Sequence, residues 1–209
     1  MISSDSSIAA AYGSRAAEYI EIAGVLEQMD ERDVAAVVRW RDETTGPLLD
    51  VGCGPGQWTA LLAEDGRDAR GIDLTESFVA FARSTYPGLP FEVGSFRRIP
   101  VPTASLGGIL SWYSLIHTPP AEVHDVLSEF ARALAPGGGL LIGFFEGEPR
   151  EPFAHAVAPA YYWNQETLGE LLVDAGFVVT GGERRAREPG EISARPHASV
   201  TAVIPRSAG

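Results

Sequence analysis

The chain has 209 residues, of which 45% are hydrophobic and 21% charged. These values are ordinary for a globular protein with an apolar core, and the length suits one α/β domain. The 16 Arg and Lys residues against 28 Asp and Glu give a formal net charge of −12, which opposes binding to a nucleic-acid phosphate backbone.

Nothing in the sequence indicates a membrane or secretory protein. No apolar run reaches the ~18–20 residues of a transmembrane helix, and residues 1–5 lack a basic residue followed by an apolar stretch. The single cysteine, Cys53, cannot form an internal disulfide, so a reducing, cytoplasmic location is the simplest interpretation. The arginines of 97–98 and 184–187 are interpreted as solvated surface.

The first 45 residues predict helical structure. Apolar residues at helical spacings predict one helix over 5–25 and a second over about 30–43, with Asp30 as the N-cap of the second. Thr45-Gly46-Pro47 then interrupts the pattern.

From residue 48 short apolar strands alternate with helices. Strands are predicted at 48–51, 69–73, 90–93, 106–112 and 140–145, and helices at 57–64, 75–86 and 119–134. Thr75 is expected to cap the second of these helices. This alternation implies right-handed βαβ crossovers and a parallel sheet with helices on both faces.

After residue 145 the alternation stops. Residues 146–163 hold prolines, glycines and aromatic residues and predict a loop, after which Asn164 is expected to cap a helix through Ala175. Residues 177–180 and 198–204 predict two strands with no helix between them, which indicates an antiparallel pair at one end of the sheet.

The turn after the first strand carries glycine at every second position, at Gly52, Gly54 and Gly56. Without side chains, these residues let a ligand approach the backbone. The next strand ends at Asp73, about 20 residues on, where a carboxylate can accept hydrogen bonds from ribose hydroxyls. In an open parallel sheet, these two strand ends flank the place where ligands bind.

The glycine spacing distinguishes between two kinds of nucleotide ligand. A dinucleotide site has the pattern G-x-G-x-x-G, but here Gln57 stands where its third glycine would be. Pro55 also removes an N–H group that would otherwise contact phosphate. The turn therefore favours a ligand without phosphates, such as an adenosine that carries an amino acid.

Residues 49–56 resemble the first motif of the class I S-adenosylmethionine-dependent methyltransferases. Residues 71–74, 134–142 and 171–177 resemble three further segments of that family, in family order, and the resemblance spans about 12–204. It implies a Rossmann-like α/β sheet of seven strands with the last antiparallel and helices on both faces. It also implies one domain, in which a helical cap (1–45) precedes a cofactor-binding core (46–145) and a lid loop with substrate-side elements (146–209).

The resemblance further implies S-adenosylmethionine as cofactor and S-adenosylhomocysteine as product. Gly52, Gly54 and Gly56 would line the methionine part, Asp50 would support the turn and Asp73 would bind the ribose. The complete expected cofactor set is Tyr12, Tyr19, Asp50, Gly52, Gly54, Gly56, Asp73, Leu74, Ser95, Phe96 and Trp112. Tyr12 and Tyr19 equally fit plain helix packing.

The adenine contact departs from the family pattern. The family usually has an acid after the third strand that accepts from the adenine amino group, and Ser95 stands in its place. Leu74 would pack on the adenine ring, and Ser95 or the backbone N–H of Phe96 is the expected polar contact.

Histidine suits a general base for a hydroxyl or amine acceptor, because its ordinary pKa is near 6.5. His117 follows the fourth strand, where a helix-capping role is the alternative, and His155 lies in the 146–163 loop; both are candidate bases. The expected acceptor pocket contains Tyr113, His117, Phe145, His155, Tyr161 and His197, whose rings favour an apolar or aromatic acceptor. No Cys/His cluster has the spacing of metal ligands, and Cys53 is interpreted as structural.

Four functions therefore remain open. Transfer of a methyl group to an O, N, C or S atom of a small molecule is favoured, with no nucleic-acid or membrane partner expected. The glycine spacing counts against an NAD(P)-dependent oxidoreductase. The net charge counts against a nucleic-acid methyltransferase, as does Ser114-Leu115-Ile116-His117 where an Asn/Asp-Pro-Pro-aromatic motif would stand. A non-catalytic cofactor-binding module would carry the same motifs. The oligomeric state is not indicated.

Overall fold

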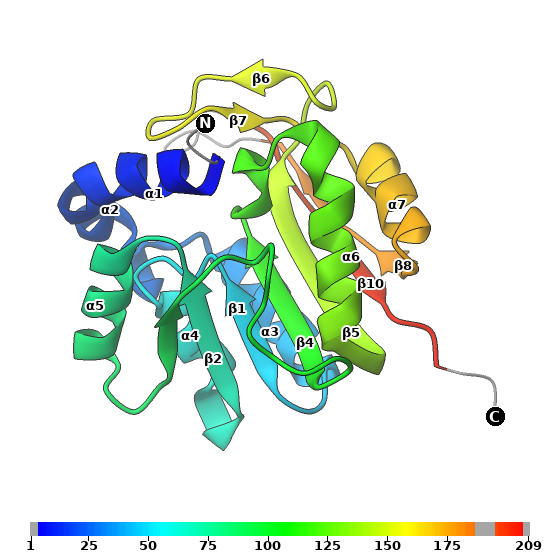
Figure 1. Cartoon of the computed structure of the whole chain (residues 1–209), viewed down its shortest axis with the longest axis horizontal. Helices are drawn as coiled ribbons and strands as arrows, with labels where there is room; N and C mark the ends of the chain where they lie inside the picture. The colour runs from blue at the N-terminus through cyan, green and yellow to red at the C-terminus, as the bar shows by residue number, and fades with distance from the viewer. Residues whose placement is uncertain (1–3, 187–194, 207–209) are drawn as a thin grey trace.

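The computed structural model of the protein describes residues 4–186 and 195–206 (Figure 1). Its centre is a mixed sheet of order β3-β2-β1-β4-β5-β10-β8, in which short β9 also pairs with β10. The strands are β1 (Leu48–Val51), β2 (Ala69–Asp73), β3 (Phe91–Val93), β4 (Leu106–Trp112), β5 (Leu134–Phe145), β8 (Val178–Gly181), β9 (Arg184–Arg185) and β10 (His197–Val203).

The strand directions confirm the predicted topology. Strands β1 to β5 run parallel, and β10 is antiparallel to β5, β8 and β9. All four residues of β1 are buried, as expected for a central strand covered on both faces. The carboxyl ends of β1, β2 and β4 consequently meet at one edge of the sheet.

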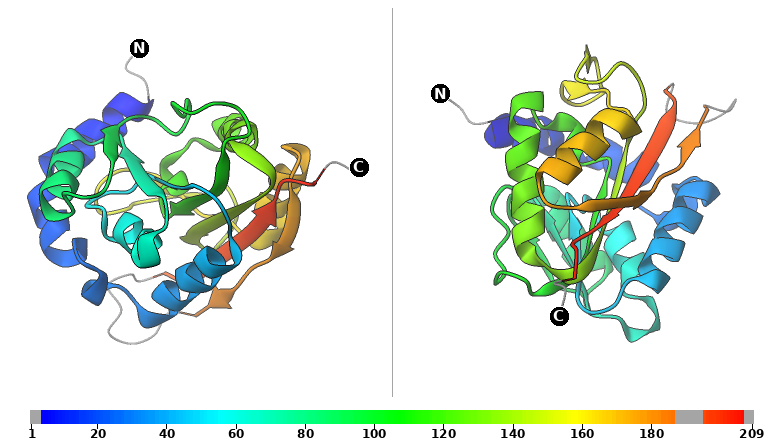
Figure 2. Two further views of the ribbon diagram at one scale, coloured as in Figure 1. Left: turned by 90° about the horizontal axis from the view of Figure 1, so that it is seen from below. Right: turned by 90° about the vertical axis from the view of Figure 1, so that its right-hand side faces the viewer.

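Helices cover both faces of the sheet (Figure 2). The helices are α1 (Ser4–Ser14), α2 (Ala16–Ala23), α3 (Glu31–Glu43), α4 (Gln57–Leu62), α5 (Glu76–Thr85), α6 (Val123–Ala133) and α7 (Gln165–Asp174). Leu48 of β1 packs in one core cluster with residues of α3 and α4, whereas its neighbour Leu49 packs in another with residues of α6 and α7. This alternation is the two-residue period of a strand.

Two predicted helix caps are confirmed by side-chain hydrogen bonds, and the third is confirmed in position only. The Asp30 side chain accepts from the Arg32 N–H at 2.9 Å, and the Asn164 side chain accepts from the Thr167 N–H at 2.8 Å. Thr75 occupies the N-cap position of α5, but its side chain makes no cap hydrogen bond. Its backbone N–H donates instead to the carboxylate of Asp73.

The predicted helix over 5–25 is wrong as a single element. It is interrupted at Arg15, whose φ of −121° and ψ of 13° lie outside the helical region, and this separates α1 from α2. Gly13 and Ser14 directly before the break are weaker helix formers than the alanines around them. The two helices lie at the carboxyl edge of the sheet, above β1 and β2 (Figure 1).

Other boundaries also differ from those predicted. Pro120–Glu122 forms a short 3-10 turn before α6, and β5 begins at Leu134 rather than 140. The predicted loop 146–163 contains an antiparallel pair, β6 (Pro152–Phe153) and β7 (Ala160–Tyr161). The connection between the two late strands contains β9, and its residues 187–194 lie outside the described part of the chain.

The arginines of 97–98 and 184–187 were interpreted as solvated surface, and this is wrong for Arg97 and Arg185. The Arg97 side chain is 24% exposed and pairs with Asp5 and Glu122. The Arg185 side chain is 15% exposed and pairs with Asp33 at 3.2 Å. No helix within 4–186 and 195–206 is long and apolar enough to cross a bilayer.

Candidate functional site

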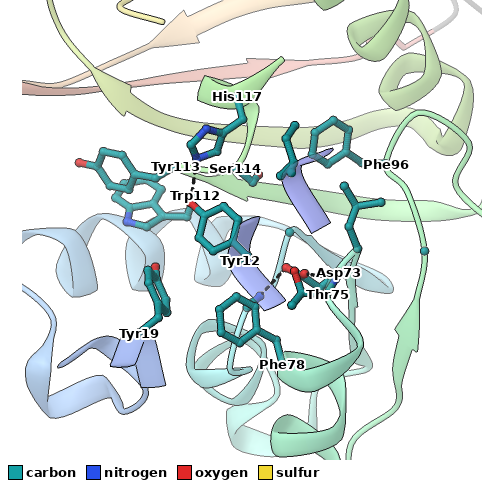
Figure 3. Close-up of a pocket in the computed structure, with 15 residues that line it drawn as sticks. Tyr12, Tyr19, Asp73, Thr75, Phe78, Phe96, Trp112, Tyr113, Ser114 and His117 are labelled. Atoms are coloured by element: carbon teal, nitrogen blue, oxygen red, sulfur yellow. Dashed lines mark hydrogen bonds between the residues drawn. The ribbon is translucent and has the colours of Figure 1, made fainter. Parts of the chain in front are cut away.

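A cleft opens at the carboxyl ends of β1, β2 and β4, and α1 and α2 form its outer wall (Figure 3). It holds about 610 Å³ of empty space, counted to its open mouth. Its lining residues are Ile8, Tyr12, Tyr19, Gly52, Gly54, Asp73, Leu74, Thr75, Phe78, Gly94, Phe96, Trp112, Tyr113, Ser114 and His117.

The glycine turn forms one wall of the cleft. Gly52, Gly54 and Gly56 have φ values of +73°, +54° and +95°, which favour glycine over residues with a Cβ. A Cβ on Gly52 would lie 2.4 Å from the Cβ of Ser114, and one on Gly56 would lie 2.9 Å from the ring of Phe91. Gly52 and Gly54 line the cleft, whereas Gly56 caps α4 behind it.

Asp73 faces the turn from the end of β2. One carboxylate oxygen accepts from the Gly54 N–H at 2.9 Å and the other from the Thr75 N–H at 2.7 Å. Burial raises the pKa of Asp73, and these backbone donors partly offset the effect. Because each carboxylate oxygen has a second lone pair, Asp73 can still accept two neighbouring hydroxyl donors from a ligand.

Asp50 lies beneath the turn and does not line the cleft. The residue is 1% exposed, and its carboxylate accepts from the Thr59 hydroxyl at 2.7 Å. Burial raises the pKa of Asp50 to about 7. Cys53 is also buried, and burial holds the pKa of its thiol well above the ordinary value, so the thiol stays protonated, in keeping with a structural role.

The far end of the cleft is apolar. Ile8, Leu74 and Phe96 contribute side chains there, and Gly94 contributes backbone. The predicted ligand contact Ser95 does not line the cleft. Its hydroxyl instead donates to the carboxylate of Asp5 at 2.6 Å, a contact that was not predicted.

Tyr12, Tyr19 and Phe78 form an aromatic wall. The ring centroids of Tyr12 and Tyr19 are 5.8 Å apart, and Phe78 lies 5.3 Å from Tyr19. Burial raises the pKa of both tyrosines, that of Tyr19 to about 12, so both phenols stay neutral. Tyr12 and Tyr19 therefore pack against neighbouring helices and also line the cleft.

His117 contacts this wall through Tyr12 (Figure 3). The Tyr12 hydroxyl lies 2.7 Å from Nε2 of His117, and Nδ1 of His117 lies 2.9 Å from the carbonyl oxygen of Pro159. A carbonyl only accepts, so Nδ1 carries the proton and Nε2 of the neutral ring accepts from Tyr12. Burial lowers the pKa of His117, which keeps the ring neutral near pH 7. The ring thus bonds to a distant loop rather than to the helix that follows it.

A second aromatic cluster lies behind His117. The His155 ring is 5.1 Å from that of His117, and the Phe145 ring is 5.3 Å from His197 and 4.9 Å from Tyr113. Burial lowers the pKa of His155 to about 4, and its Nδ1 has no hydrogen-bond partner among the described residues.

Of the residues predicted for the acceptor, the structure places Tyr113 and His117 in the cleft. Phe145, His155, Tyr161 and His197 do not line it. His197 instead lines a second hollow with Tyr113 and Trp112, on the side of α3 and β9. Trp112 and Tyr113 therefore separate the two spaces. No group of three potential metal ligands occurs within the described ranges.

The amino-acid sequence is similar to those of known proteins. Residues 48–138 match a methyltransferase domain family. The chain is 31% identical over 163 residues to a probable S-adenosylmethionine-dependent methyltransferase of Mycolicibacterium smegmatis, an alignment that covers 73% of this chain and 61% of that protein. Residues 48–138 thus carry the methyltransferase domain of that family, and the chain is similar to the class I S-adenosylmethionine-dependent methyltransferases.

Solved structures agree on this fold. The cyclase SpnF superposes with a TM-score of 0.80 at 20% identity over 98% of both chains. The 1,6-didemethyltoxoflavin-N1-methyltransferase of Burkholderia thailandensis, solved with 1,6-didemethyltoxoflavin and S-adenosylhomocysteine bound, superposes with a TM-score of 0.74 at 22% identity. That alignment covers 96% of this chain and 87% of the other.

Some residues that line the cleft were not predicted. Ile8 precedes Tyr12 by four residues, so the helical repeat that drew attention to Tyr12 also places Ile8 on its face. Phe78 lies in the first turn of α5, directly after the Asp73 strand end. Ser114 had no such signal, because its place depends on the left-handed backbone of Tyr113, with φ of +55°.

Proposed function

We propose that this protein binds S-adenosylmethionine in the cleft and transfers the methyl group to a small molecule. The observation that carries the proposal is the pairing of Asp73 with the Gly52–Gly56 turn. A carboxylate able to accept two hydroxyl donors faces backbone without side chains, and the far end of the cleft is apolar. This arrangement suits a nucleoside with an amino-acid substituent and no phosphate.

The cleft residues fit the parts of that cofactor in order. Gly52 and Gly54 would contact the amino-acid part, with Asp50 and Thr59 supporting the turn from below. Asp73 would bind the ribose hydroxyls. The adenine would lie among Leu74, Phe96 and Ile8, and Tyr12, Tyr19 and Trp112 would cover the remaining length.

When bound, the cofactor supplies both the sulfonium methyl group and its own leaving group, so the protein mainly aligns the acceptor and excludes water. Tyr12 and His117 would handle the acceptor's proton. The Tyr12 oxygen takes a proton from the acceptor hydroxyl or amine while its own proton passes to Nε2 of His117. Nδ1 keeps its proton on the Pro159 carbonyl, which leaves the imidazolium that results with both N–H groups hydrogen-bonded.

The acceptor would enter beside Tyr113 and His117 and would be apolar or aromatic. Phe145 and His197 pack behind Tyr113, and His155 packs behind His117. In this arrangement His155 orients the His117 ring rather than acting as a second base. The net charge of −12 supports a small-molecule acceptor over nucleic acid, and the single buried cysteine supports a cytoplasmic location.

A cofactor-binding protein that does not transfer methyl groups is the second candidate. The similarity in fold to the cyclase SpnF favours keeping it, because the same sheet there belongs to a protein named for another reaction. Binding of the cofactor without turnover on a broad acceptor panel would select this candidate.

Calorimetry with S-adenosylhomocysteine tests the binding step. Asp73→Ala removes two hydrogen bonds to a charged group, each worth about 1.5–3 kcal/mol, so we expect binding to weaken by at least about 100-fold. Asp68→Ala, on the exposed residue before β2, is the matched control and should bind as the wild type does. Equal affinity of Asp73→Ala and wild type would remove the ribose assignment, and no heat with wild type would overturn the function. Heat with NAD instead would favour the oxidoreductase.

The transfer step requires an acceptor panel of phenols, amines and thiols, with S-adenosylhomocysteine release as the readout. His117→Ala should bind the cofactor normally and transfer the methyl group about 100- to 10,000-fold more slowly if the acceptor is a hydroxyl or protonated amine. Full activity of this variant on such an acceptor would exclude His117 as the base.

A further inference from the structure

The adenine end of the cleft lacks a polar side chain among its lining residues, yet adenine carries an amino group that donates hydrogen bonds. Ile8, Leu74 and Phe96 present apolar side chains there. An amino group enclosed by them without an acceptor would lose a hydrogen bond that it makes in water. A side-chain acceptor for this amino group would therefore come from just beyond the lining residues.

Asp5 lies at that place. It shares one face of α1 with Ile8 and Tyr12, since the three are spaced by three and four residues, and both of the others line the cleft. Its side chain is 21% exposed. It therefore continues the cleft-facing side of α1 by one turn, toward the segment that follows β3.

Ser95 connects Asp5 to the cleft wall. It stands between Gly94 and Phe96, which both line the cleft. Its hydroxyl donates to one oxygen of Asp5 at 2.6 Å and accepts from the Arg97 N–H at 3.1 Å. The only hydroxyl proton of Ser95 is thus directed at Asp5, and the negative charge at this edge belongs to Asp5.

Arg97 fixes the Asp5 carboxylate. Its Nε donates to the other Asp5 oxygen at 2.7 Å, and its opposite side pairs with Glu122 at 2.7 Å. Among the described residues, two donors occupy one lone pair on each Asp5 oxygen, and the second lone pair on each oxygen is available to a ligand. A carboxylate held in this way is an oriented acceptor.

We propose that Asp5 accepts a hydrogen bond from the amino group of the cofactor's adenine and so determines specificity for that base. This rests on the proposed function, because it places S-adenosylmethionine in the cleft. The helix that covers the cleft would then also recognise the base.

The test compares two ligands that differ only in this amino group. One is S-adenosylhomocysteine, and the other is its analogue with hydrogen in place of the 6-amino group, which keeps N1 as an acceptor. A hydrogen bond to a charged acceptor implies that wild type binds the first about 10- to 100-fold more tightly. In Asp5→Ala the two affinities should agree within about threefold.

Glu122→Gln is the matched control. It removes the other carboxylate paired with Arg97 but leaves Asp5 in place, so the wild-type ratio should persist. If Asp5 served only to hold α1 against the rest of the protein, Asp5→Ala would weaken the binding of both ligands equally and leave the ratio of the two affinities unchanged. That result would overturn the inference.

A second variant moves the carboxylate. Adding Ser95→Asp to Asp5→Ala restores an acid at the same edge, from the segment after β3, and should restore the ratio; a ratio that stays near one would count against this position of the amino group. Failure of wild type to bind S-adenosylhomocysteine at all would refute the proposed function itself. Tight but non-discriminating binding by wild type would refute only the role of Asp5.

Discussion

Asp50 should make the protein less stable as the pH rises, and its replacement should remove this effect. Asp50 is 1% exposed, and the one hydrogen bond to its carboxylate among the described side chains comes from Thr59. Burial raises its pKa from 3.8 to about 7. In the unfolded chain it ionises near the ordinary value. The unfolded state therefore gains stability relative to the folded state between about pH 4 and pH 7.

The size of this effect follows from the two pKa values. A difference of one pH unit corresponds to about 1.4 kcal/mol, so a rise from 3.8 to about 7 corresponds to a cost of about 4 kcal/mol above pH 7. Below about pH 4 the group is protonated in both states and costs nothing. Asp50→Asn keeps an acceptor for the Thr59 hydroxyl and carries no charge at any pH.

We expect Asp50→Asn to be more stable than wild type by about 4 kcal/mol at pH 8 and by less than about 1 kcal/mol at pH 4. Urea unfolding without cofactor at pH 4, 5, 6, 7 and 8 measures this, since ligand binding would add its own stabilisation. Asp174→Asn, on an exposed residue of α7, should stay within about 0.5 kcal/mol of wild type throughout. A difference for Asp50→Asn that is constant with pH, or a variant less stable than wild type at pH 8, would refute the reasoning.

Three further outcomes are expected. In NMR titrations of the imidazole protons, His117 should titrate below 6.5 and His155 near 4, because burial disfavours their charged forms; a midpoint at or above 6.5 for either would contradict its described environment. Gly52→Ala should lower the melting temperature by at least about 5 °C and abolish S-adenosylhomocysteine binding, because its Cβ would clash with Ser114 at a φ of +73°, whereas Gly88→Ala, with open space around it, should melt like wild type. Trp163→Ala empties a fully buried site and should cost about 3–5 kcal/mol in urea unfolding; a loss below about 1 kcal/mol would mean that the site collapses around the smaller side chain.

Local sequence determined what could be predicted of the fold. Asp30 and Asn164 cap helices through hydrogen bonds to residues two and three positions away, so their roles follow from the neighbouring sequence. The glycine turn and Asp73 are likewise set by adjacent strand ends. Gly13 and Ser14 are only a weak local signal for the break at Arg15, and the short strand β9, which pairs with β10, had no signal of this kind.

Contacts between residues far apart in the chain could not be predicted from the sequence. Ser95 was expected to meet a ligand, but its hydroxyl donates to Asp5, 90 residues away. The protonated nitrogen of His117 is set by the carbonyl of Pro159, 42 residues away. The types of residue at the site could therefore be predicted, whereas the state of each side chain required the three-dimensional arrangement.

Helix α1 has no buried residue, although it forms the outer wall of the cleft. Lifting it away would break the polar contacts of Asp5 and Tyr12 and also the ring contacts of Tyr12 with Tyr19, Phe78 and His117. Asp5 and Tyr12 also face the bound cofactor or the base in the proposed arrangement. Release of the demethylated product and loss of the proton relay would then be one motion, and salt, by screening the Asp5–Arg97 pair, would accelerate it.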